Sequence, residues 1–208
     1  GSVPIASAVT LSQNDINLNS VSISTSALIA TNTYAFNAKI TDVAGNVSAA
    51  SANYNVSIDT AAPTVSSLAL SATGAQGGTL NAGDVITVTA NMSEATTVTG
   101  TPQMALVIGG NTVQANYAGG SGTNALTFSY TILANQTDAN GISLGTNALT
   151  LNGATLRDAV GNNANLATAA VADSANFKVD TTAAAAPTIT TVADDVGSII
   201  TAVLSGGS

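Results

Sequence analysis

Residues 126–132 read LTFSYTI, and this stretch decides the fold class of the chain. Apolar and aromatic residues alternate with Thr and Ser, so every second side chain from Leu126 to Ile132 falls on one face of an extended strand. Residues 85–90, VITVTA, repeat the pattern, with Ile86 and Val88 on one face. Alternation of this kind indicates half-buried β-strands.

The same pattern continues along the chain between turns rich in Gly and Asn, such as Gly77-Gly78 and Asn140-Gly141. No segment has a helical period. The strands of the middle region are predicted near residues 64–72, 84–91, 103–109, 111–117, 125–133, 148–157 and 174–180. Seven short strands in such a length fit an immunoglobulin-like antiparallel β-sandwich. The predicted fold class is therefore all-β, with sandwich repeats in tandem.

A five-residue motif supports the tandem arrangement. Residues 42–46, DVAGN, recur as residues 158–162, DAVGN, and each copy precedes a short strand that ends in an Asp-Thr pair. Ala-rich stretches ending in Pro follow these pairs, at residues 60–63 and 181–187. The spacing of the two copies is that of a domain repeat. Because Pro restricts the backbone, the two stretches are predicted to be short linkers of limited freedom.

The motif and the linkers divide the chain into three parts. Residues 1–62 are predicted to be the C-terminal part of an immunoglobulin-like repeat, and residues 63–183 a complete sandwich. Residues 184–208 would supply the opening strand or strands of a next repeat. The chain is expected to be a piece of a longer protein, with Gly1-Ser2 as a cloning remnant.

Composition narrows the possible functions. The 208 residues include no Cys, His or Trp, which excludes Ser–His–Asp and Cys–His nucleophiles and metal sites built on Cys or His. Lys and Arg total 3 against 11 Asp and Glu, for a formal net charge of -8. So few basic residues argue against nucleic-acid binding, and no apolar run is long enough for membrane insertion. The remaining chemistry is that of carboxylate, amide and carbonyl oxygens, the ligands of Ca²⁺.

Strand direction predicts where calcium would bind. Because strands of a sandwich run alternately up and down, two loops of the middle domain should return to the end at which the preceding linker enters. Carboxylates brought together there would repel one another unless a cation neutralised them. The predicted ligands of this first site are Asp59, Glu94, Asp158 and Asn162. A second site at the opposite end would use Asp84, Asp138 and Asp180, with Asp194 and Asp195 from the following unit. Asp42 and Asn46 would serve a preceding junction. Pure turn formation stays an alternative for the Asp-x-x-Gly-Asn motif.

Two other site chemistries are disfavoured. Lys39 and Lys178 raise the possibility of isopeptide bonds, but both lie between inward-facing residues and should point outward. A glycosidase built on paired carboxylates usually has aromatic sugar platforms, and four Tyr, three Phe and no Trp supply few. The chain is therefore predicted not to be an enzyme, nor a carbohydrate-binding module.

The tail from Pro187 to Ile199 and the stretch 25–63 resemble the opening and closing halves of the bacterial immunoglobulin-like repeats of giant biofilm-associated and RTX-type surface adhesins. The middle region resembles a sister repeat at residues 79–84, 93–94, 100–102 and 136–141. The resemblance implies extracellular rods that are stiffened by Ca²⁺ at domain junctions. The glycine-rich nonapeptides of the RTX calcium β-roll are missing.

The expected function is that of a structural or adhesive module of a secreted or cell-surface bacterial protein, stiffened by Ca²⁺. Its partners would be neighbouring repeats of the same chain or other copies of itself, with no nucleic acid and no membrane insertion. The alternative is a self-assembling subunit of an extracellular filament or sheath, joined when a strand such as the tail 187–208 completes a terminal domain of the next molecule.

Overall fold

A computed structural model describes residues 9–12, 22–25, 28 and 32–188, and within these residues the protein contains strands and turns but no helix. The predicted all-β class is confirmed. The strands are β1 Asn32–Phe36, β2 Tyr54–Ile58, β3 Val65–Thr73, β4 Thr79–Leu80, β5 Val85–Thr99, β6 Gln103–Ile108, β7 Asn111–Gly119, β8 Thr123–Thr131, β9 Thr137–Asp138, β10 Leu149–Thr150, β11 Thr155–Arg157 and β12 Lys178–Asp180.

Strand pairing separates the hairpin β1–β2 from the rest. In the larger sheet the order is β10-β6-β7-β8-β5-β11, and β3 pairs with β5 on the side away from β8. A smaller sheet has the order β4-β12-β9. Pairing is antiparallel except between β12 and β4, which run parallel. These sheets are consistent with a β-sandwich.

β5 is the longest strand of the larger sheet and pairs with three others. Its first half pairs with β3 on one side and β8 on the other, and its last residues pair with β11. Side chains of β5 alternate between buried and less buried positions from Val85 to Met92, as period-2 patterning requires. Its register with β8 then shifts between Asn91 and Thr96. A shift of this kind bends the strand and changes the direction of its side chains.

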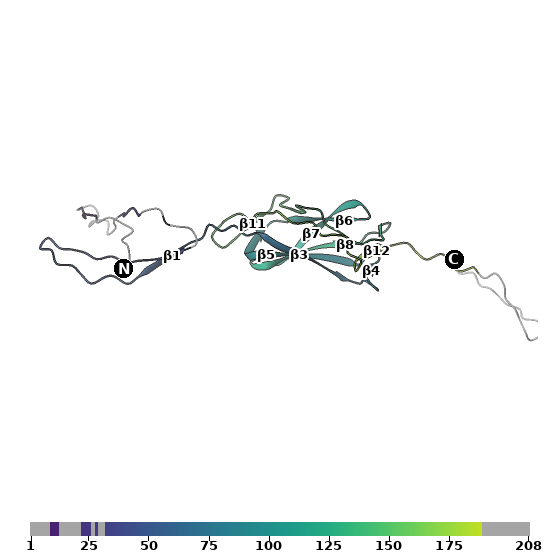
Figure 1. The fold of residues 1–208 in the computed structure, drawn as a ribbon, viewed down its shortest axis with the longest axis horizontal. Coiled ribbons are helices and arrows are strands. Elements are labelled where there is room, and N and C mark those ends of the chain that lie inside the picture. The colour runs from purple at the N-terminus through teal and green to yellow at the C-terminus, as the bar shows by residue number, and fades with distance from the viewer. Residues whose placement is uncertain (1–8, 13–21, 26–27, 29–31, 189–208) are drawn as a thin grey trace, which may run out of the picture.

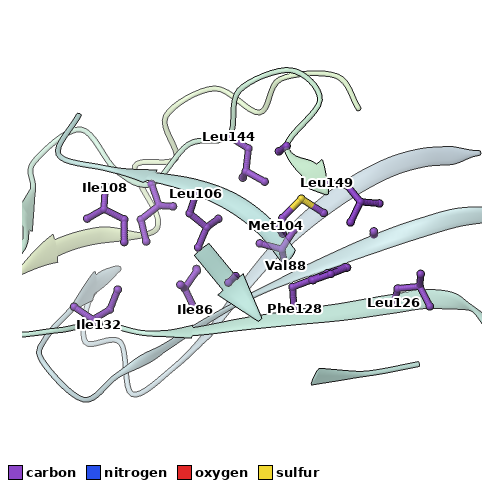
Figure 2. Close-up of a cluster of buried hydrophobic side chains, with 14 of the residues drawn as sticks. Ile86, Val88, Met104, Leu106, Ile108, Leu126, Phe128, Ile132, Leu144 and Leu149 are labelled. Carbon is purple, nitrogen blue, oxygen red and sulfur yellow. The ribbon is translucent and has the colours of Figure 1, made fainter. Parts of the chain in front are cut away.

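The core lies between the facing strands of the region 65–179. Figure 2 shows Ile86, Val88, Leu106 and Phe128 pointing into the shared interior. Phe128 is fully buried, and its ring meets that of Tyr117 edge-on with 5.8 Å between centroids. Among the described residues, the buried hydrophobic cluster takes all its members from this region.

The N-terminal hairpin lies outside that core. Figure 1 shows β1 toward one end of an elongated molecule and β12 toward the other. Tyr34 and Phe36 are half-buried in β1, but the strand ends at Phe36, and Ile40 is 65% exposed. The prediction that the neighbours of Lys39 face inward is therefore wrong for Ile40, and residues 37–53 are all exposed.

Replacing the central aromatic of the core tests this packing. Phe128→Ala should destabilise the chain by about 3–5 kcal/mol, since it removes buried area and leaves a cavity. Val43→Ala, at a fully exposed position in the hairpin, is the matched control and should change stability little. Urea unfolding followed by circular dichroism measures both. Equal losses for the two variants would contradict the assigned core.

Candidate metal centre

The first linker segment, residues 59–63, begins directly after β2 and is fixed at both ends. One carboxylate oxygen of Asp59 accepts a hydrogen bond from the Ala61 amide at 2.9 Å, which turns the chain. Pro63 is fully buried, and its carbonyl accepts from the Asn165 amide at 2.8 Å. Beyond it, Thr64 exchanges hydrogen bonds with Ser93, through the Ser93 backbone amide and hydroxyl. The linker therefore enters the larger sheet at a defined position.

Glu94 is placed by the irregular part of β5. The sequence predicted a loop here, but Glu94 lies within the strand, between Asn91 and Thr96, where the register with β8 shifts. The buried Thr96 hydroxyl donates to the Glu94 carbonyl at 3.1 Å and supports the local bend. The neighbouring Ser93 holds the linker, so Glu94 is brought to the same end of the sheet.

The Asp158 loop, residues 158–162, follows β11 and is a tight turn organised by its first side chain. One oxygen of Asp158 accepts hydrogen bonds from the amides of Val160, Gly161 and Asn162 at 2.7–2.9 Å. The other accepts from the Asn162 side-chain amide at 2.7 Å. Gly161 has a φ of 100°, which side chains other than Gly rarely tolerate. The Asp-x-x-Gly-Asn motif at residues 158–162 therefore forms a single tight turn.

These three segments bring three carboxylates together. One oxygen each of Asp59, Glu94 and Asp158 lies within 4.8 Å of the others, and within the part of the chain that is described this is the one acidic group compact enough to hold a metal ion. Asp158 is 6% exposed, whereas Asp59 and Glu94 are half-buried. The linker therefore supplies one potential ligand and two distant parts of the sandwich supply the others.

The carboxylates respond differently to this crowding. Partial burial, followed by the negative charges of Asp59 and Asp158, raises the pKa of Glu94 above its ordinary value of 4.5. Burial also acts to raise the pKa of Asp158, but the hydrogen bonds from Asn162, Gly161 and Val160 outweigh it and hold that pKa below 3.8. Asp158 is thus compensated by its loop, while Glu94 bears uncompensated repulsion.

Asn162 connects the loop to the linker. Its side-chain amide donates to the backbone carbonyls of Asp59 and Ala61, both at 3.2 Å, as well as to Asp158. The amide was predicted as a metal ligand, and its NH₂ group is engaged in holding the linker backbone. Sequence reasoning missed these carbonyl contacts, and also Ser93 and Asn165, because no motif marks a residue that binds a linker backbone.

The predicted second site is more dispersed. Asp84 and Asp180 line one open pocket with Gln76, Asn81 and Thr182. Asp84 accepts a hydrogen bond from the Asn81 amide at 2.7 Å, and Asp180 from the Thr182 amide at 2.9 Å. Asp194 and Asp195 lie outside the described residues.

Asp138, the third residue predicted for that site, is used within the fold. It is 4% exposed, and its two carboxylate oxygens accept from the Gly109 and Gly141 amides, each at 2.8 Å. These bonds join two turns to β9. The sequence predicted Asp138 as a metal ligand, and it gave no sign of the hydrogen bond from the Gly109 amide, which comes from a distant turn.

The residues predicted for a preceding junction form a second copy of the tight turn. Asp42 accepts hydrogen bonds from the amides of Ala44 and Asn46 at 2.9 and 2.8 Å, and from the Asn46 side chain at 2.9 Å. The Asn46 bonds, its side chain first, lower the pKa of Asp42. Both residues are exposed, unlike their counterparts in the Asp158 loop.

Comparison of the chain with protein-family models, with curated proteins and with solved structures gave no match. Among the described residues there is no helix of the length and apolar character that crossing a membrane takes. The acidic cluster of Asp59, Glu94 and Asp158 is accordingly interpreted from its own geometry.

Removing one charge from this cluster tests its electrostatics. In EDTA at pH 7, Glu94→Gln should be more stable than the native chain, because native Glu94 must ionise beside Asp59 and Asp158. A raised pKa destabilises the fold as pH rises through it, so the difference should vanish below the ordinary value of 4.5. Chemical unfolding at several pH values measures it. A less stable variant at pH 7 would contradict the repulsion.

The role of Asp138 has a separate test. Asp138→Asn leaves one acceptor oxygen for two buried amide donors and should cost about 1–3 kcal/mol. Asp173→Asn, at an exposed carboxylate that accepts from the Asn140 side-chain amide, removes the same charge but keeps an acceptor oxygen, and it should be nearly neutral. Thermal melts in EDTA compare the two, and an undisturbed Asp138→Asn variant would show that the two backbone bonds contribute little.

Proposed function

We propose that the chain is a non-catalytic structural module in which Ca²⁺ binds at the junction between the N-terminal hairpin and the sandwich. The observation that carries the proposal is the meeting of Asp59 from the linker with Glu94 and Asp158 from the sandwich, within 4.8 Å. A cation there would neutralise repulsion that otherwise destabilises the folded chain.

The donor set favours a hard cation. Three carboxylates supply oxygen ligands only, and Ca²⁺ accepts six to eight oxygens in flexible geometry, completing its shell with backbone carbonyls and water. The sequence contains no Cys or His, the ligands that zinc and copper sites prefer. Asp59 and Glu94 are half-buried, so ion and water have access.

The mechanical consequence follows from where the ligands lie. Asn162 and Pro63 already fix the linker backbone on one side. An ion bound by Asp59, Glu94 and Asp158 would add a second attachment, from the start of the linker to β5 and to the Asp158 loop. Two attachments restrict bending better than one, so ion binding would set the angle between hairpin and sandwich.

The proposed setting is a large extracellular bacterial surface protein, in which immunoglobulin-like repeats joined in this way form a rod. The support is the resemblance of the repeat motifs and linkers to those of surface adhesins, together with the all-β fold. Extracellular modules bind Ca²⁺ with dissociation constants of about 10⁻⁴–10⁻³ M. A site with three carboxylates and partial exposure suits that range.

Calcium should stabilise the full chain. At a concentration a hundredfold above the dissociation constant, a ligand bound only by the folded state adds about 2.7 kcal/mol, or about 5–20 °C in Tm. Calorimetric melts with Ca²⁺ and with EDTA measure the shift. Glu94→Gln should abolish most of it, while Asp173→Asn should keep it. An unchanged Tm in the native chain would remove the calcium proposal.

Calcium should also narrow the range of angles that the hairpin adopts relative to the sandwich. Small-angle X-ray scattering of the full chain should give a larger and better defined maximum dimension in Ca²⁺ than in EDTA, since the hairpin stops bending about the linker. Glu94→Gln should scatter alike in both conditions. If Ca²⁺ raised the Tm but left the scattering unchanged, the metal site would stand and its stiffening role would be contradicted.

A further inference from the structure

The two Asp-x-x-Gly-Asn turns have the same structure. In the Asp42 loop, residues 42–46, and in the Asp158 loop, the first residue donates its backbone amide to the carbonyl of the last, at 3.0 and 3.2 Å. In both, the Asp side chain accepts from the loop amides and from the Asn side chain. Gly45 and Gly161 share a positive φ of 89° and 100°. An antiparallel bridge closes each turn, Thr41 with Val47 and Arg157 with Asn163.

One of these turns holds a linker and the other does not. The Asn162 amide donates to the carbonyls of Asp59 and Ala61 in addition to Asp158. A side-chain amide has two N–H donors. Within the described residues, Asn46 donates only to Asp42, which leaves one donor for an incoming carbonyl. Asp42 is exposed, whereas Asp158, beneath its linker, is 6% exposed.

The two linkers match as well. The first linker segment follows β2, and its Asp59 side chain accepts from the amide two residues on, at 2.9 Å. The second linker segment, residues 180–187, begins at the last residue of β12, and Asp180 accepts from the Thr182 amide at the same distance. Residues 182–187 are exposed along their length. Asp180 pairs with Thr137 of β9, and the Thr181 hydroxyl donates to the Gln136 carbonyl at 2.9 Å. The exposed part of the second linker segment is therefore residues 182–187, and it is exposed in the same way as the Asp42 loop.

We propose that the Asp42 loop is a docking site for the second linker segment of another copy of this chain. Asn46 would donate to backbone carbonyls of the exposed residues 182–187, as Asn162 does to those of Asp59 and Ala61. Because the loop lies toward one end of the elongated molecule and the second linker toward the other, the contact joins copies head to tail (Figure 1). Such a contact is heterologous, so its repetition builds open chains, or rings where the rotation closes.

Apolar side chains around the Asp42 loop would contribute to the contact. Ile40, Val43 and Val47 are exposed by 65%, 110% and 60%. The second linker segment is Ala-rich and carries no positive charge, so its fit to this surface is through backbone bonds and small apolar groups. The contact uses none of Asp59, Glu94 and Asp158, and it therefore stands or fails independently of the calcium site proposed at that cluster.

Sedimentation of the full chain in EDTA tests the proposal. The weight-average mass should rise with concentration up to about 1 mM, the range of a weak contact. Excess peptide of residues 180–187 should reverse the association, and a scrambled peptide should not. Asn46→Ala should weaken association about tenfold, since it removes the side-chain amide that would donate hydrogen bonds to the linker carbonyls of the other copy. Asn37→Ala, in the same hairpin with its amide bonded to Asn53, is the matched control.

A second readout places the contact. In the ¹⁵N-labelled full chain, the same peptide should shift the amide resonances of Ala44, Gly45 and Asn46 more than those of the Asp158 loop, which holds its own linker. A chain that stays monomeric at every concentration would overturn the proposal. So would association that persists unchanged in Asn46→Ala or in the presence of the peptide, because the copies would then meet through another surface.

Discussion

The attachment of the first linker segment to the Asp158 loop is the contact on which the arrangement of the molecule depends. Asn162 holds two carbonyls of the linker, and Pro63 is buried beside them. These neutral bonds bring Asp59 against Glu94 and Asp158, which no attraction between carboxylates would do. The hydrogen bonds of the linker thus create the charge cluster, and the cluster in turn makes the junction sensitive to cations.

The two carboxylates of the sandwich, Asp158 and Glu94, differ in how their charges are compensated. Asp158 has its charge satisfied by loop amides, and its lowered pKa means that its ionised form stabilises the fold. Glu94 lacks such compensation, and its raised pKa reflects partial burial and its two acidic neighbours. Asp158 is therefore needed for the turn with or without metal. Glu94 is the position at which a substitution separates metal binding from folding.

The sequence carried enough information for the main strands and for this cluster. Alternation located β5 and β8, because one face of each is buried in the core. Strand direction then brought Asp59, Glu94 and Asp158 to one end. Alternation did not locate β4 and β9, because a strand of two residues is too short to show a period. It also placed Glu94 in a loop, because the register shift in β5 depends on tertiary pairing with β8.

The site predicted at the opposite end shows a further limit. From the sequence alone, every Asp is a potential metal ligand. In the structure, both carboxylate oxygens of Asp138 accept hydrogen bonds from backbone amides of two turns. That occupation depends on Gly109, which is distant in sequence and carries no motif. Turn chemistry is local and can be read from sequence, but whether a carboxylate remains available to an ion depends on which backbone amides the fold brings to it.

Isothermal titration calorimetry of the EDTA-treated full chain with CaCl₂ tests the central claim most directly. The account predicts saturable binding at the Asp59–Glu94–Asp158 cluster with a dissociation constant of about 10⁻⁴–10⁻³ M, lost in Glu94→Gln and kept in Asp173→Asn. The absence of saturable binding, or a binding curve that Glu94→Gln leaves unchanged, would contradict it.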